Sequence, residues 1–102
     1  MACKPGTPTL PRPQVDRLLP MVPGWSVEEA GGHLRLARTV SFKGFMPGVS
    51  LVERIAAIAE AEGHHPDLLL GYGSLTIWLW THAAGGLTEN DFILAARVSA
   101  AI

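Results

Sequence analysis

The chain has 102 residues, a length that suits one compact domain with one hydrophobic core. Apolar residues make up 48% and charged residues 17%, which is the composition of a folded globular domain. The formal net charge of -1 gives no general attraction to phosphate backbones, so direct binding of nucleic acid is not expected.

The N-terminal region is rich in proline and contains the one cysteine, Cys3. A single cysteine excludes an intrachain disulfide and a multi-thiolate metal site, and it agrees with a reducing compartment. Because residues 1–13 contain no apolar run, neither a secretory signal nor a membrane anchor is expected there. We predict a flexible proline-rich arm over residues 1–13, a single domain over residues 14–102, and a cytoplasmic protein without membrane attachment.

The first half of the domain predicts a short helix and a hairpin. Residues 14–19 are expected to form a helix that ends before Pro20, because proline disrupts a helix interior. Residues 25–29 and 33–42 are expected to be strands joined by Gly31-Gly32, since paired glycines permit the backbone angles of tight hairpin turns. The second strand alternates apolar residues toward one face: Leu34, Leu36, Val40 and Phe42.

The second half begins with the strongest helical pattern of the chain. Apolar residues recur at spacings of three and four over residues 45–62, which predicts an amphipathic helix with Gly63 as its C-terminal cap. Short apolar runs at residues 68–70 and 75–81 flank a turn at residues 71–74 and predict a second hairpin.

The last predicted element is a helix that runs to the C-terminus. Thr88 is expected to cap it and Asp91 to answer as the acid of a capping box, while Leu87 packs against Phe92. The order helix, strand, strand, helix, strand, strand, helix predicts an α+β domain. We expect the helices to cover one face of a four-stranded antiparallel sheet.

Three of the four histidines, His64, His65 and His82, follow the long helix or end the last strand. Imidazoles titrate near neutral pH, so one ring can donate a proton while another accepts one. Pro66 restricts the backbone of His65 and so helps to set how the adjacent rings diverge. Glu60 lies where the helix dipole is already negative, which predicts a cationic neighbour.

The spacing of these residues resembles the motif of the pterin-4a-carbinolamine dehydratases. The likeness covers roughly residues 15–102, leaving out the N-terminal arm. It includes the Ala-Glu-rich end of the long helix and four short segments: Gly24-Trp25, residues 42–45, Thr81-His82 and Gly86-Leu87-Thr88. The residues that match the motif are Glu60, His64, His65, Pro66, Tyr72, His82 and Asp91.

The resemblance implies that the substrate is a 4a-hydroxytetrahydropterin, dehydrated to the quinonoid dihydropterin during tetrahydrobiopterin recycling, without a metal or organic cofactor. It implies that His64, His65 and His82 surround the pterin. We expect His64 and His82 to transfer protons and His65 to bind or orient the substrate. The residues expected to help bind or orient it are Glu60, Pro66, Asp67, Tyr72 and Thr81, whereas Thr88 and Asp91 are expected to be structural caps.

Three alternatives stay open at the level of sequence. A zinc or non-haem iron site could use the histidines and Glu60, but they lack the intervals of two ligands on one helix, and the resemblance implies a metal-free site. The Tyr72 side chain either packs against its neighbours or lines the cleft expected to bind the substrate. His33 is expected to be a surface strand residue. The pterin chemistry could also belong to molybdenum cofactor metabolism.

The chain departs from many relatives at Leu68, Trp78 and Trp80. Leu68 replaces a tryptophan that follows the histidines in many relatives, which puts substrate affinity in doubt. Trp78 and Trp80 are expected on the open sheet face, because side chains alternate along a strand. A large apolar patch there predicts a homodimer or homotetramer, or a protein-binding and dimerisation module as the alternative function.

Overall fold

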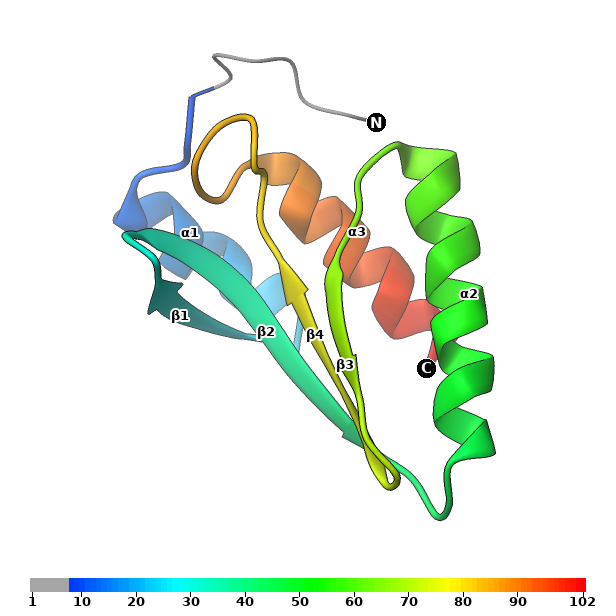
Figure 1. The fold of residues 1–102 in the computed structure, drawn as a ribbon. Helices are drawn as coiled ribbons and strands as arrows, with labels where there is room; N and C mark the ends of the chain where they lie inside the picture. The colour runs from blue at the N-terminus through cyan, green and yellow to red at the C-terminus, as the bar shows by residue number, and fades with distance from the viewer. Residues whose placement is uncertain (1–7) are drawn as a thin grey trace.

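The computed structural model describes residues 8–102, which form one antiparallel sheet with helices on one side (Figure 1). The predicted α+β class and element order are confirmed. The elements are α1 (Arg12–Leu18), the short 3-10 helix η1 (Leu19–Met21), β1 (Ser26–Ala30), β2 (His33–Ser41), α2 (Met46–Glu62), β3 (Asp67–Leu70), β4 (Ser74–Leu79) and α3 (Glu89–Ala101).

Two hairpins, β1–β2 and β3–β4, build the sheet by pairing β2 with β4, so the strand order is β1-β2-β4-β3. The first hairpin turns at Gly31 and Gly32, whose φ angles of 60° and 82° favour glycine. The central pairing runs from Leu36 opposite Leu79 to Ser41 opposite Ser74. Because the two strands are antiparallel, the start of β2 lies close to the segment that follows β4.

The core lies between the sheet and the helices. Leu75, Ile77 and Leu79 of β4 are fully buried, so the predicted alternation of this strand is confirmed. They pack with fully buried side chains of the helices: Val15, Leu51, Ile55, Leu94 and Val98. Figure 1 shows α2 and α3 side by side on this face.

The C-terminal end of α2 and the N-terminal end of α3 form as the sequence predicts. Gly63 caps α2 with φ 64° and ψ 29°, a left-handed conformation that turns the chain directly into His64. Thr88 and Asp91 form the capping box that begins α3. Leu87 and Phe92, which flank this box, are both buried in the core.

The element boundaries lie within one or two residues of the predicted ones, and the two largest differences are at the start of α1 and the end of β4. Helix α1 begins at Arg12 rather than residue 14, because a proline is tolerated in the first turn of a helix, where its missing N–H costs nothing. Strand β4 ends at Leu79, and Thr81 forms an isolated bridge with Gly86 because residues 82–85 turn the chain back.

The expected arm over residues 1–13 falls largely on residues 1–7, which lie outside the described residues together with Cys3. Within its described part, the backbone N–H of Leu10 donates to the carbonyl of Leu87 at 2.8 Å. Across residues 8–102, no helix combines the length and apolarity that spanning a bilayer requires.

Candidate active site

A buried hydrogen bond joins His64, just after the end of α2, to Asp91, in the first turn of α3. The distance from His64 Nε2 to Asp91 Oδ1 is 2.7 Å, and the two side chains are 6% and 0% exposed. The capping prediction for Asp91 is confirmed, but its pairing with His64 was not foreseen. The sequence feature that pointed to a link between them is that both residues belong to the same motif.

Two threonines complete the hydrogen bonding of the Asp91 carboxylate. Thr81 Oγ1 donates to Asp91 Oδ2 at 2.8 Å, and the Thr88 backbone N–H donates to the same oxygen at 2.9 Å. The hydroxyl oxygens of Thr81 and Thr88 are 2.9 Å apart, and both side chains are buried. Thr81, expected to orient the substrate, thus contacts the carboxylate that holds His64.

The hydrogen bonds decide which nitrogen of His64 can exchange a proton. When the Asp91 carboxylate is ionised it only accepts hydrogen bonds, and His64 Nε2 then carries the hydrogen that points to it. In the neutral ring the lone pair is then on Nδ1. The arrangement leaves Nδ1 as the atom through which His64 can act as a base.

His65 lies beside this network but outside the core. Its Nε2 contacts Glu60 Oε2, with the two side chains 61% and 76% exposed. The neighbour of Glu60 is therefore an imidazole five residues further along the chain, which is cationic only when it is protonated. Exposed pairs of this kind contribute little to stability, on the order of 0–1 kcal/mol.

His82 lies in the turn after β4 and stacks on Trp80. The two ring centroids are 3.9 Å apart with an interplanar angle of 27°. His33 stacks on the same indole at 3.6 Å and 15°. The sequence reasoning treated His33 as a surface strand residue and missed this contact, because it joins two strands that are far apart in the chain.

The open sheet face does not carry the exposed tryptophan patch that the sequence predicts. Trp78 donates from Nε1 to Glu28 Oε1 at 2.9 Å, and the Arg35 guanidinium lies 4.8 Å from the centre of its ring. Trp80 is covered by the two imidazoles, and both indoles are only partly exposed. Polar side chains therefore cover these rings, and a large apolar patch at this place is a wrong prediction.

The remaining predicted residues lie along β3 and its turn. Pro66 directly precedes β3, and Asp67, exposed, pairs in register with Trp78. Leu68 packs against the core. Tyr72 is 76% exposed in the turn between β3 and β4, at the opposite end of β3 from the histidines (Figure 1). Within one chain Tyr72 is thus not brought to His64.

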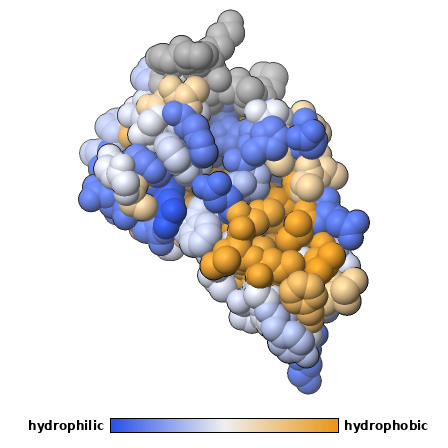
Figure 2. All heavy atoms as spheres, in the orientation of Figure 1, coloured by the Kyte–Doolittle hydropathy of each residue, from blue (hydrophilic) through white to orange (hydrophobic). Residues whose placement is uncertain are grey.

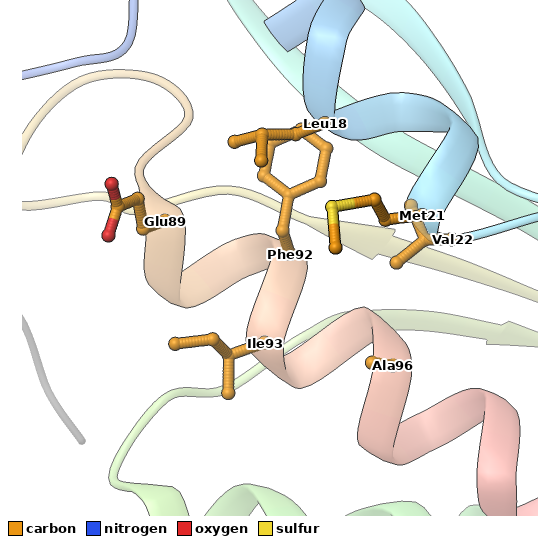
Figure 3. Close-up of a pocket in the computed structure, with 7 residues that line it drawn as sticks. All are labelled: Leu18, Met21, Val22, Glu89, Phe92, Ile93 and Ala96. Atoms are coloured by element: carbon orange, nitrogen blue, oxygen red, sulfur yellow. The ribbon is translucent and has the colours of Figure 1, made fainter. Parts of the chain in front are cut away.

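An apolar pocket of about 390 Å³ lies between η1 and α3, with α1 at its rim (Figure 3). Its lining contains one titratable side chain, Glu89, and no histidine; the other lining residues are Leu18, Met21, Val22, Phe92, Ile93 and Ala96. It therefore lacks a pair of groups for acid–base chemistry. Within residues 8–102, no three His, Cys, Asp or Glu side chains are grouped as a metal site requires.

The fold and these side chains define a class: small α+β proteins with a four-stranded antiparallel sheet, helices on one face, and histidines directly after α2 and after β4. The family profile of pterin 4 alpha carbinolamine dehydratase matches residues 8–101. The chain belongs to the pterin-4a-carbinolamine dehydratase family.

Relatives and a solved structure agree with this placement. A Chlorobium limicola protein named for the same enzyme is 46% identical over 95% of this chain and 88% of its own. Pterin-4-alpha-carbinolamine dehydratase 2 of Arabidopsis thaliana, named as mitochondrial, is 51% identical over 80% of this chain and 44% of its own length. The Brucella melitensis transcriptional coactivator/pterin dehydratase superimposes with a TM-score of 0.81 at 27% identity, covering 91% of this chain and 97% of that one.

A more distant structure shares the fold alone. A pterin dehydratase-like protein described as a RuBisCO assembly factor in the alpha-carboxysome has a TM-score of 0.64 at 23% identity, over 76% of this chain and 88% of that one. The same fold therefore occurs in a protein that is described as an assembly factor.

Proposed function

We propose that this protein dehydrates a 4a-hydroxytetrahydropterin to the quinonoid dihydropterin by histidine acid–base catalysis. The observation that carries the proposal is the buried His64–Asp91 pair, in which a fully enclosed carboxylate orients one imidazole. Carboxylates that hold a ring nitrogen in this way set the tautomer of the imidazole and stabilise its cation. Membership of the family supplies the substrate class.

The reaction breaks the bond between C4a and its hydroxyl, which leaves as water, and removes the proton from N5. His64 Nδ1 accepts the N5 proton, and Asp91 stabilises the imidazolium that forms. His82, in its protonated form, donates to the departing hydroxyl. General acid–base help of this kind is worth roughly 10²- to 10⁴-fold. No metal or organic cofactor takes part in this proposal.

We place the reaction in the return of tetrahydrobiopterin to a hydroxylase, since the quinonoid product needs a reductase before it can serve again. The cytoplasmic location expected from the sequence stays a prediction, because the relative from Arabidopsis thaliana is named as mitochondrial. Molybdenum cofactor metabolism is the alternative context for the same pterin chemistry.

The test is the dehydration rate of an enzymatically generated 4a-hydroxytetrahydropterin, measured against the spontaneous background. We expect the wild-type protein to accelerate the reaction and the double variant His64→Ala/His82→Ala to fall close to the background. Chelator-treated protein should retain its rate. Wild-type protein that does not exceed the background would leave a binding role as the better account, and a rate lost to chelator and restored by a metal would reinstate the metal alternative.

We also propose that the chain assembles into a homodimer or homotetramer. Large apolar side chains are exposed at Phe45, Met46 and Leu69, and Figure 2 shows apolar residues gathered on the side where β3 and α2 lie. Leu69, on the edge strand β3, is 61% exposed. Exposed apolar surface of this kind is usually covered by a partner. Light scattering should give a mass of two or four times 10.9 kDa, and a strictly monomeric protein would contradict this.

A further inference from the structure

Three aromatic rings form a column beside the start of β2 and just beyond the end of β4: His33, Trp80 and His82 (the ring column). The centroids of His33 and Trp80 are 3.6 Å apart, and those of Trp80 and His82 are 3.9 Å apart. Both imidazoles are nearly parallel to the indole, at 15° and 27°. Two rings that close to one indole cannot share a face of it, so they cover its opposite faces.

The sheet register explains why these rings meet. Leu36 of β2 lies opposite Leu79 of β4, so the residues after β4 run beside the first residues of β2. His33 is the first residue of β2, directly after the glycine turn, and its Nδ1–H donates to the Leu34 carbonyl at 3.2 Å. Trp80 packs partly against the core, which anchors the middle ring of the column.

The stack on Trp80 is what orients His82. The His82 side chain is exposed in a turn and, within residues 8–102, makes no hydrogen bond or ion pair. His64 differs, because Asp91 holds its ring through Nε2. A turn residue without such a partner would sample several rotamers, and offset stacking on an aromatic ring restricts that sampling.

We propose that His33 is a positioning residue for dehydration: by packing on the far face of Trp80, it keeps the indole in place under His82. This rests on the proposed function, in which His82 donates a proton. The column acts on the orientation of the proton donor, so its loss should lower kcat more than it raises KM. Stacking on an aromatic ring can raise the population of one side-chain orientation by up to about tenfold.

The test combines kinetics with the NMR signals of the His82 ring, which a stacked indole shifts upfield. We expect His33→Ala to lower kcat about three- to tenfold with little change in KM, and His33→Phe, which keeps a flat ring, to restore most of it. Trp80→Ser should lower kcat at least as far and move the His82 ring signals downfield. The matched control is Trp78→Phe, two residues earlier on the same face, which should leave both readouts unchanged.

Two outcomes would overturn the inference, and each is distinct from failure of the proposed function. If His82→Ala abolishes the rate while His33→Ala and Trp80→Ser change neither kcat nor the His82 signals, the column has no positioning role and the catalytic proposal stands. If His82→Ala retains the wild-type rate, His82 is not the proton donor and the inference falls with that assignment. Thermal unfolding of each variant separates these results from loss of fold.

Discussion

Replacing Asp91 by alanine is expected to cost about 3 kcal/mol of stability and to lower the dehydration rate by about 100-fold or more. The side chain is fully buried and is paired with His64, Thr81 and the backbone of Thr88. Its removal abolishes the capping box and leaves buried donors without an acceptor. Each donor left unsatisfied costs roughly 1–3 kcal/mol of stability. For a domain of this size the melting temperature should fall by roughly 12–24 °C.

Asparagine at the same position separates the cap from the catalytic role. Asp91→Asn keeps the shape and one acceptor oxygen, so most of the fold should survive, but a neutral amide does not stabilise an imidazolium on His64. We expect a correctly folded variant with a rate lowered by at least about tenfold. Calorimetry and the dehydration assay measure the two effects independently.

The matched control is Glu89→Gln, which neutralises an exposed acid in the same first turn of α3. Its stability should stay within about 0.5 kcal/mol of wild type, and its rate should be unchanged. A folded Asp91→Asn protein with the wild-type rate would reduce Asp91 to a helix cap and remove the main support for His64 as the base.

Single histidine variants are expected to divide into two groups. His64→Ala and His82→Ala should each slow dehydration by roughly 10²- to 10⁴-fold, because each removes one of the two proton transfers. His65→Ala should cost less than about tenfold, since this ring lies at the surface in an exposed pair with Glu60. The measurement is kcat and kcat/KM for each protein on the same pterin.

The reverse order would contradict this division of roles. Folded His64→Ala and His82→Ala proteins with nearly wild-type rates, beside a His65→Ala protein without activity, would make His65 the essential group. Glu60→Gln serves as a control for the exposed pair, because it removes the partner of His65 and leaves all three imidazoles in place. Its effect should not exceed that of His65→Ala.

Much of this molecule could be predicted from local signals in the sequence. The left-handed cap at Gly63, the glycine turn before β2 and the capping box at Thr88 each depend on the chemistry of a few neighbouring residues. The alternation of β4 depends on the period of a strand, so its buried face was predictable as well. The motif that contains the histidines and Asp91 indicated the family for the same reason: it is read along the chain.

Tertiary structure decided which side chains meet. Asp91 is a cap by local sequence, and only the packing of α2 against α3 makes it the partner of His64. His33 and Trp80 are 47 positions apart in the printed sequence, and only the pairing of β2 with β4 stacks their rings. Local propensities act over a few residues, whereas these contacts follow from how whole elements pack, which no short stretch of sequence encodes.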